Sequence, residues 1–485
     1  MTSIIGCDSF LSLRNVHNGN LDQYLDGLHV LVDPNQIAGS RIACPRTEID
    51  PLIDFDANSE PTMAGLLLKA YLARKAYYDP RTLWTEMRGS IGRNYPNQRL
   101  RRLVSTTRSG MRFMTGWVNG ALGRAQSGRQ ECARALRSHP SARHYRRLFE
   151  AIAPDMVCSF SPEGLREMLL LEAANDAGLP TAVMIRSRDN LAVKIQHLPN
   201  ADRYFVWAEA TRSFLLSMYP EIDAAKIEVA GSPQFDHHLD PSYRLKREEF
   251  FELVRLDPGR HLIVYTMMTP GLYDQEIEIA QHLADAAHAG RFAGKAQLLV
   301  RGHPRMFGSD IKLLHREYEE ARAYPSPREV PFRSKDHEAE VVRLIIEDER
   351  VHLSTLAYQD VQVNVCGTMT IDSAILDKPV VNIYYDAAKG LDSSASVRRF
   401  YARSDVKQMM AYGASRLARN PEDCIRLINR YLEDPSLDAD GRRRAREEDC
   451  GPLDGKAGWR IATSLGRVSV GKAGYRGVGA PVFSA

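Results

Sequence analysis

The sequence lacks the features that mark secreted, zinc-binding or membrane-spanning proteins. Its seven cysteines are scattered along 485 residues, and no Cys-x-x-Cys pair occurs. This pattern indicates neither a disulfide framework nor a zinc site, and it favours a reducing, cytoplasmic compartment. The first ten residues, MTSIIGCDSF, have neither the basic start nor the apolar core of a signal peptide. No apolar run approaches the roughly 18 residues needed to cross a bilayer. If the protein acts at a membrane, we therefore expect it to bind the membrane surface and not to span the bilayer.

One long stretch has almost no acidic residues and no lysine. Between Arg88 and Arg147 the chain has fourteen arginines, and Glu131 is the one acid. Apolar residues such as Met111, Phe113 and Trp117 alternate with the arginines. Such a segment can lie on an anionic membrane or hold a polyanionic substrate, or it can be a solvated helical insertion with a basic surface. No recognisable DNA- or RNA-binding module accompanies it, so we do not expect a nucleic-acid partner.

The first half of the chain has the alternating pattern of an α/β domain. An amphipathic helix is expected from Leu165 to Ala177, and Gly178-Leu179-Pro180 ends it. Apolar runs predict strands at Ser3–Cys7, Leu28–Val32, Asp155–Ser159, Thr181–Ile185, Tyr204–Trp207 and Ile227–Ala230. We assign residues 1–240 to this domain, with the basic helical insertion at about 62–150.

The second half repeats the pattern after a polar linker at Asp236–Arg247. Strands are predicted at Leu262–Thr266, Gln297–Arg301, Val351–Ser354, Val361–Val365 and Pro379–Ile383. Helices are predicted at Pro421–Leu432 and Lys456–Ser464. We assign residues 241–465 to the second domain and 466–485 to a glycine-rich tail. The predicted architecture is α/β, with two tandem domains whose strand ends face each other across a cleft.

The most informative segment is VQVNVCGTMTIDSAILDKPVVNIYYD, from Val361 to Asp386. It predicts a strand, a small-residue turn, a helix and a second strand, as in a parallel βαβ unit. Ligands of open α/β sheets bind at such turns because the N–H groups that start the helix face the crevice. Gly367, Thr368 and Thr370 are therefore candidate phosphate-binding residues, and Asp372 can accept a hydrogen bond from a ribose. A helix cap without a ligand explains the same residues equally well.

Two further loops follow predicted strands. Arg301 and His303, in the sequence RGHP, form a natural anion clamp at a strand end. In the first domain the loop RSRDN, Arg186 to Asn190, contains Asp189, which can act as a base if burial raises its pKa. A turn with solvated arginines explains this loop too. Two Asp-x-Asp strings, which some transferases use to hold a metal, occur at Asp54–Asp56 and Asp438–Asp440. Neither follows a convincing strand, so we interpret both as loop acids and expect no metal.

Several motifs occur in a fixed order between Pro154 and Ala462. They are DRYFVW, IEVAGSPQFD, LIVYT, LLVRGHP, the segment from Val361 to Asp386, and DGKAGWRIA. Together they resemble the CDP-glycerol glycerophosphotransferase-like group of GT-B glycosyltransferases, and especially its members in bacterial capsule and surface-polysaccharide synthesis. The resemblance implies a GT-B fold with two Rossmann-like domains. In this fold the first domain faces the acceptor and the second binds the nucleotide donor.

The resemblance also implies roles for individual residues. Its members have a base in a Trp-His-Gly or Trp-Asp-Asn segment, with a lysine a few residues later. Here Asp189 matches the base, although arginine replaces the tryptophan. His303 matches a histidine that contacts the donor diphosphate, and Thr368 matches a phosphate-binding serine or threonine, while Gly367 replaces a serine. The expected acceptor-side residues are Glu163, Arg186, Arg188, Asn190 and Lys194.

We therefore expect a cytoplasmic glycosyltransferase or polyol-phosphate transferase that needs no metal cofactor. Its expected partners are a nucleotide-sugar or CDP-polyol donor, a glycan or lipid-linked acceptor, and the inner face of the cell membrane through the Arg88–Arg147 block. One alternative is a sugar-nucleotide epimerase of the UDP-N-acetylglucosamine 2-epimerase type, whose Gly-Gly and paired-glutamate signature this chain replaces by CGTMTID. The other is a non-catalytic nucleotide- or glycan-binding protein on the same fold.

Overall fold

The computed structural model divides the chain into two compact units. Unit 1 comprises residues 1–236 and 451–485, and unit 2 comprises residues 237–450. The residues that the structure describes are 2–7, 15–25, 27–32, 48–51, 125–187, 190–191, 195, 197–269, 271–303, 312–324, 338–388, 391 and 395–473. No helix among these residues is long and apolar enough to cross a membrane.

Unit 1 is built on a seven-stranded parallel sheet of order β3-β2-β1-β4-β5-β6-β7. The strands are β1 (Ser3–Cys7), β2 (Leu28–Val32), β3 (Glu48–Pro51), β4 (Met156–Ser159), β5 (Thr181–Met184), β6 (Arg203–Val206) and β7 (Ile227–Val229). Every residue of β1, β4 and β5 is buried. Buried parallel strands are near-continuous apolar runs because helices cover both faces of the sheet, and this is why composition alone locates them.

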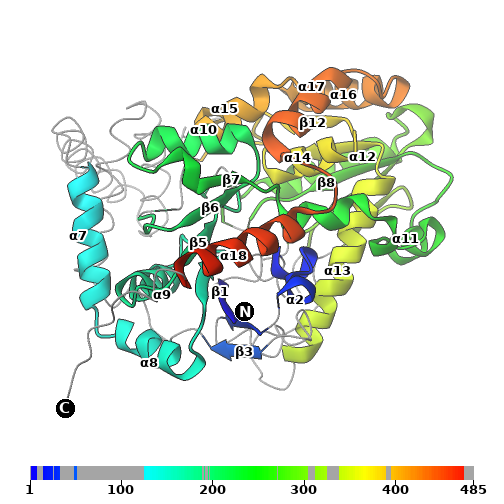
Figure 1. Cartoon of the computed structure of the whole chain (residues 1–485). Coiled ribbons are helices and arrows are strands. Elements are labelled where there is room, and N and C mark those ends of the chain that lie inside the picture. The colour runs from blue at the N-terminus through cyan, green and yellow to red at the C-terminus, as the bar shows by residue number, and fades with distance from the viewer. Residues whose placement is uncertain are drawn as a thin grey trace, which may run out of the picture. The chain divides into compact units, whose positions relative to one another are not determined.

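The helices of unit 1 surround that sheet (Figure 1). They are α2 (Leu21–Tyr24), α7 (Ala125–Ser138), α8 (Ala142–Ile152), α9 (Leu165–Asp176), α10 (Glu209–Met218) and α18 (Ala457–Ala473). One apolar cluster joins α7, α8 and α9 through residues such as Leu136, Tyr145 and Leu169. The described part of the basic insertion is thus helical and packed, while residues 62–124 lie outside the described part of the chain.

Unit 2 has a six-stranded parallel sheet of order β10-β9-β8-β11-β12-β13. Its strands are β8 (Leu262–Thr266), β9 (Gln297–Arg301), β10 (Ala321–Tyr324), β11 (Val361–Asn364), β12 (Val380–Ile383) and β13 (Arg416–Ala418). Its helices are α11 (Arg247–Val254), α12 (Glu276–His288), α13 (Glu338–Tyr358), α14 (Thr368–Ile375), α15 (Ser404–Ala411), α16 (Pro421–Glu433) and α17 (Ala439–Ala445).

The strand order of each sheet reverses at one point. In unit 1 the reversal lies between β1 and β4, and in unit 2 it lies between β8 and β11. Open α/β sheets bind ligands beside such a reversal, at the carboxyl ends of the strands. The topology therefore directs attention to the segments that follow β4 in unit 1 and β8 and β11 in unit 2.

One predicted strand is wrong. Val351–Ser354 belongs to α13, a helix of 21 residues. The run VHLS is short enough to suit a strand, but it belongs to a part of α13 that is buried around most of its circumference, since Val351 and all residues from 353 to 356 are buried. A short apolar run does not distinguish a buried strand from such a buried helix segment. Sequence analysis also missed β3, β10 and β13, each of only three or four residues.

The predicted second domain, 241–465, also needs correction at its end, because residues 451–465 belong to unit 1. Asp236 accepts hydrogen bonds from the backbone N–H groups of Ala457 (3.1 Å) and Gly458 (3.0 Å) at the start of α18. A Cβ at Gly458 would lie 1.9 Å from the carbonyl oxygen of Gly19, so the helix approaches that backbone closely. Figure 1 shows α18 in red and α2 in blue, two elements that contact each other. The first boundary falls inside the predicted linker.

Candidate functional site

The segment after β11 forms an accessible helix start in unit 2. β11 ends at Asn364, and α14 begins at Thr368, with Gly367 as its N-cap residue. Thr368 is exposed and Gly367 is partly exposed. A Cβ built on Gly367 would have no atom within 4 Å, so the space beside this turn is open. Because the first N–H groups of a helix carry partial positive charge, this turn has the chemistry of an anion-binding site.

A histidine and a threonine lie at the neighbouring strand ends. His303 follows β9, Thr269 follows β8, and His303 Nε2 lies 3.2 Å from Thr269 Oγ1. Both side chains are partly exposed. The hydroxyl thus orients an imidazole at the edge where β8 and β11 mark the strand reversal. An imidazole held there can donate a hydrogen bond to a phosphate oxygen.

Arg301 has an internal partner. Its side chain is only 6% exposed, and Nη2 lies 2.9 Å from Asp348 Oδ1 on α13. Its guanidinium also lies over the Tyr324 ring, 5.0 Å from the centroid. These contacts hold β9 against β10 and α13, and a donor-binding role for Arg301 remains a prediction.

Thr370 and Asp372 also face inward. Thr370 is 1% exposed, and its hydroxyl lies 3.1 Å from Asn382 Nδ2 and 3.4 Å from the Asn364 amide group. Asp372 Oδ1 lies 3.3 Å from His238 Nε2. Both residues thus fasten α14 to the rest of unit 2. Their predicted roles, phosphate and ribose binding, are not tested by these contacts.

A buried glutamate that sequence analysis missed holds the segment after β8. Glu276, in the first turn of α12, accepts hydrogen bonds from the Met268 N–H (2.8 Å) and the Tyr265 hydroxyl (3.2 Å). Burial raises the pKa of Glu276 to about 7, against the opposing effect of these two hydrogen bonds. Glu276 therefore fixes the residues that precede Thr269. A glutamate at a helix start ordinarily indicates a solvated residue, so the sequence had no signal for this role.

In unit 1 the structure brings together three of the predicted acceptor-side residues. Glu163 follows β4, and Arg186 follows β5. Arg186 Nη2 donates to Glu163 Oε1, and Asn190 Nδ2 lies 3.4 Å from the same oxygen. The Ser187 hydroxyl donates to Asn190 Oδ1 at 3.1 Å. The side chains of Arg186 and Glu163 are 10% and 19% exposed. This edge of the first sheet thus has a partly buried polar cluster, whereas Arg188, Asp189 and Lys194 lie outside the described residues.

Glu167, on α9, is a second glutamate that the sequence did not single out. It is fully buried, accepts from the Ser161 N–H at 2.9 Å, and receives the hydroxyl of Ser159. It holds the turn after β4 that leads to Glu163.

The described residues contain no group of three or more His, Cys, Asp or Glu side chains placed to hold a metal ion. Asp438, from one Asp-x-Asp string, forms an ion pair with Arg416 and immediately precedes α17, with no side-chain hydrogen bond to the helix start. Asp440 lies within α17 and pairs with Arg443, so it is a helix residue and not a loop acid as predicted.

No protein-family model matches this chain, and no curated protein sequence matches it. Several solved structures are similar to this chain. UDP-GlcNAc 2-epimerase from Neisseria meningitidis, bound to UDP-GlcNAc, aligns at a TM-score of 0.54 with 12% identity, over 96% of this chain and 100% of that one. Alignment with S. aureus MnaA in a co-structure with UDP gives a TM-score of 0.51 and 11% identity, over 96% of both chains.

A putative UDP-N-acetylglucosamine 2-epimerase from Listeria monocytogenes aligns at a TM-score of 0.51 with 10% identity, over 100% of this chain and 99% of that one. This chain has the GT-B fold. The predicted fold class, two Rossmann-like α/β domains, is therefore confirmed. Likeness at this level of identity concerns the fold and not the reaction.

Proposed function

We propose that this protein is a glycosyltransferase or polyol-phosphate transferase that uses a nucleotide-activated donor. The observation that carries the proposal is the open start of α14 beside the strand reversal of unit 2, with the Thr269–His303 pair at the adjacent strand ends. A donor diphosphate needs dispersed positive partial charge, both when it binds and when it departs. The N–H groups of Gly367 and Thr368, the Thr368 hydroxyl and His303 supply it without a metal.

The acceptor is proposed to bind at the polar cluster of unit 1. Glu163, Arg186 and Asn190 supply both hydrogen-bond donors and acceptors, as recognition of a hydroxyl-rich glycan requires. Asp189 is the proposed base that removes the proton of the acceptor hydroxyl, on the strength of its resemblance to the Asp of the Trp-Asp-Asn motif. We propose a glycan or lipid-linked acceptor of a bacterial surface polysaccharide and a cytoplasmic, membrane-peripheral site of action.

The second candidate is a sugar-nucleotide epimerase, because the structural likenesses described above are to UDP-GlcNAc 2-epimerases. The two activities leave different products. An epimerase converts UDP-GlcNAc into its C2 epimer without an acceptor, whereas a transferase releases the nucleotide when an acceptor is present. Product analysis by nuclear magnetic resonance with and without acceptor therefore separates them.

Donor binding is tested first, with a thermal-shift screen against UDP, CDP, GDP, CMP and their sugar or polyol conjugates. A ligand that binds the folded state raises its melting temperature by mass action. Replacing His303 by Ala should then weaken the affinity for the nucleotide that binds by about tenfold, the effect of losing about 1.4 kcal/mol. The matched control is His288→Ala, because His288 is an exposed histidine of unit 2 that pairs with Glu320. Absence of binding by every nucleotide, or equal affinity of H303A and wild type, would overturn the proposed donor site.

A further inference from the structure

One arginine of the basic insertion is almost completely buried. Arg129, on α7, is 4% exposed. Its Nε donates to the Leu198 carbonyl at 2.8 Å, and Nη2 lies 3.3 Å from both the Pro199 carbonyl and the Tyr204 hydroxyl. Its Nη1 forms an ion pair with Glu221 at 2.9 Å. The planar guanidinium therefore binds three acceptor groups and one carboxylate at once, which a lysine could not do.

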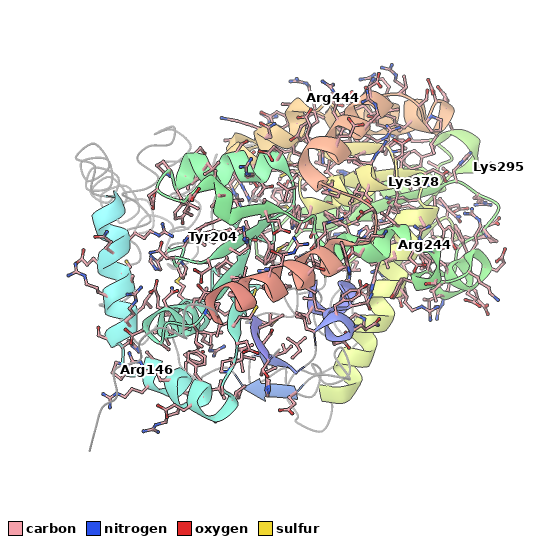
Figure 2. All side chains as sticks on the ribbon, in the orientation of Figure 1. Arg146, Tyr204, Arg244, Lys295, Lys378 and Arg444 are labelled. Atoms are coloured by element: carbon pink, nitrogen blue, oxygen red, sulfur yellow. The ribbon has the colours of Figure 1, made fainter. Side chains whose placement is uncertain are left out.

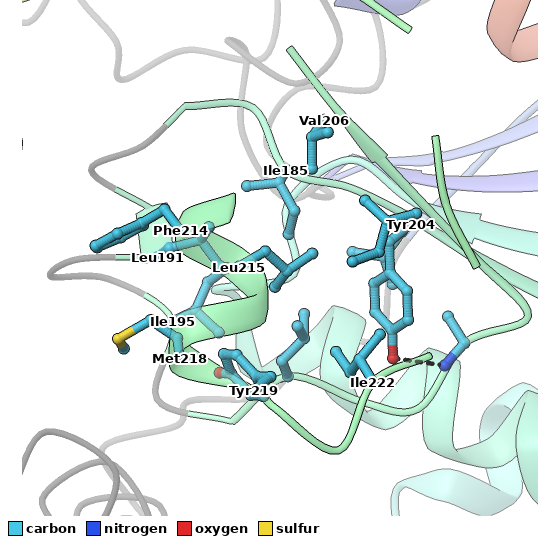
Figure 3. Close-up of a cluster of buried hydrophobic side chains, with 14 of the residues drawn as sticks. Ile185, Leu191, Ile195, Tyr204, Val206, Phe214, Leu215, Met218, Tyr219 and Ile222 are labelled. Atoms are coloured by element: carbon cyan, nitrogen blue, oxygen red, sulfur yellow. Dashed lines mark hydrogen bonds between the residues drawn. The ribbon is translucent and has the colours of Figure 1, made fainter. Parts of the chain in front are cut away.

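Arg129 binds the carbonyl groups of Leu198 and Pro199, which lie near the end of the β5–β6 loop. We define this loop as residues 185–202. Arg186 and Asn190 of the proposed acceptor cluster belong to the same loop. Within it, the Ile195 N–H donates to the Asn190 carbonyl at 2.8 Å. Figure 3 shows Leu191 and Ile195 in an apolar cluster with Leu215, Met218 and Tyr219. The loop thus has an apolar anchor beside its polar residues, and Arg129 fixes its end.

A second contact joins α7 to the same loop. Glu172, on α9, is fully buried, and its two oxygens have different partners. Oε2 accepts from Arg137 Nε of α7 at 2.9 Å, and Oε1 lies 3.3 Å from His197 Nε2 of the loop. Burial alone would raise the pKa of Glu172, but His197 and Arg137 outweigh it and lower that pKa. Arg137, Glu172 and His197 therefore form a charge-stabilised bridge, since a buried carboxylate needs such partners.

Other insertion arginines differ in their surroundings. Arg146 of α8, labelled in Figure 2 with Tyr204 of β6, pairs with Asp176 at 3.0 Å. Arg134, Arg143 and Arg147 are exposed. The described arginines of the insertion therefore divide into those whose side chains contact other parts of unit 1 and those that face solvent. The high arginine content of this part of the chain is thus partly explained by arginines with internal structural contacts.

We infer that α7 is a clamp on the β5–β6 loop, and that Arg129 and Arg137 are positioning residues for the acceptor side of the site. The assignment of this loop to the acceptor side rests on the proposed function. The contacts between α7 and the loop belong to the fold and do not depend on that function. Arg129 holds the loop directly at Leu198 and Pro199. Arg137 holds it through Glu172 and His197.

The test compares Arg129→Gln and Arg137→Gln with Arg134→Gln, an exposed arginine on the same helix. Amide hydrogen exchange is measured in the peptide that covers Asn190 to Leu198 and in peptides from β4 and β5. Arg129→Gln should speed exchange of the Ile195 amide by at least about tenfold, and Arg137→Gln by a smaller factor, because opening of the loop controls this exchange. Arg134→Gln should leave it unchanged. Wild-type exchange at Ile195 in both clamp variants, with β4 and β5 intact, would overturn the inference.

Two further variants guard against simple misfolding. If Arg129→Gln also exposes β4 and β5, Arg129→Lys takes its place. A lysine keeps the charge but loses the fork of donors, so exchange at Ile195 should lie between wild type and the glutamine variant. Glu172→Gln removes the negative charge that Arg137 and His197 share, and it should match Arg137→Gln in its effect on the loop. If the exchange rate at Ile195 changed in parallel with that of β4 in every variant, Arg129 would stabilise unit 1 as a whole. That result would refute a clamp specific to the loop.

Enzyme kinetics can reject the clamp and the proposed transferase function separately. Once an acceptor is known, Arg129→Lys should raise the acceptor KM or lower kcat severalfold while the donor KM stays at its wild-type value. Donor binding that is absent in the wild type would reject the proposed function, while the exchange experiment would still decide the clamp. Equal loss of donor and acceptor affinity in Arg129→Lys would reject the positioning role.

Discussion

Each unit has a buried glutamate beside the strand reversal of its sheet, but the two glutamates follow strands on opposite sides of the reversal and have different partners. In unit 1 Glu167 holds the turn after β4, and in unit 2 Glu276 holds the segment after β8; each lies in the first turn of the next helix. Glu167 binds two serines through a hydroxyl and a backbone N–H, whereas Glu276 binds a backbone N–H and the phenol of Tyr265. Both strands border the strand reversal of their sheet.

The comparison shows that buried carboxylates within each unit already hold the segments at the two sheet edges, without any contribution from a ligand. A loop that leaves a strand presents backbone donors, and a buried carboxylate satisfies one of them in each unit. With burial raising its pKa to about 7, Glu276 titrates near neutral pH. The segment that precedes Thr269 is therefore expected to respond to pH.

The largest effect is expected from breaking the unit 1 contact with Glu167→Ala. The change leaves a cavity and the buried Ser159 and Ser161 donors without their acceptor, which together should cost about 4 kcal/mol of unfolding free energy. Urea unfolding monitored by hydrogen exchange in unit 1 measures this loss. Glu150→Ala, at an exposed position of α8, is the control and should change stability by less than about 0.5 kcal/mol. A similar small value for E167A would show that this carboxylate does not hold the turn.

A smaller effect, visible as a pH dependence, is expected from Glu276→Gln. The folded-state pKa of about 7 exceeds the ordinary glutamate value of 4.5. Between these values the folded state keeps a proton that the unfolded state has lost, so the unfolding free energy decreases as pH rises to about 7 and then levels off. Relative to E276Q, the wild type should lose up to about 3 kcal/mol between pH 4.5 and 8.

Unfolding curves of both proteins across this pH range provide the measurement. Glu278→Gln, at an exposed position in the same turn of α12, should reproduce the wild-type slope. A difference between wild type and E276Q that stays constant with pH would contradict the raised pKa.

The smallest effect on stability is expected from the buried side chains of the strands beside the two strand reversals. Unit 1 has Val157 and Cys158 in β4, whereas unit 2 has the buried amides of Asn364 and Asn382 against Thr370. Thr370→Val keeps the volume but removes a hydroxyl from this cluster, so it should cost about 1 kcal/mol. The melting temperature measures it, and Thr368→Val at the exposed helix start is the control. Equal stability of the two variants would show that the amides satisfy each other.

Strand positions could be predicted because burial on both sheet faces leaves a local pattern. Leu262–Thr266 and Val361–Asn364 are such runs, and they were found. The strand predicted at Val351–Ser354 is wrong because a four-residue apolar run does not distinguish a buried strand from a helix segment that is buried on most sides, as α13 is here. The order of the strands, and hence the location of the reversal, was not predicted, because it depends on pairing between segments that are far apart in the sequence.

The sequence correctly placed several candidate residues after strands, but it did not predict their contacts. Strand ends locate Thr368, His303 and Arg186. The partners of Arg301, Thr370 and Asp372 are Asp348, Asn382 and His238, and no local pattern connects these pairs. Arg129 shows the same limit, because its charge looks identical in sequence to that of the exposed Arg134. Tertiary neighbours alone decide which arginine binds carbonyl groups and which faces water.

The return of residues 451–473 to unit 1 has a consequence for synthesis of the chain. In connectivity, unit 2 is an inserted domain, and all of its residues are synthesised before those of α18. We therefore expect the amino-terminal part of unit 1 to complete its packing only after unit 2 has been synthesised, because the helix that Asp236 contacts comes later in the chain. Unit 1, although it contains the first residues of the chain, is thus expected to be the last to finish folding.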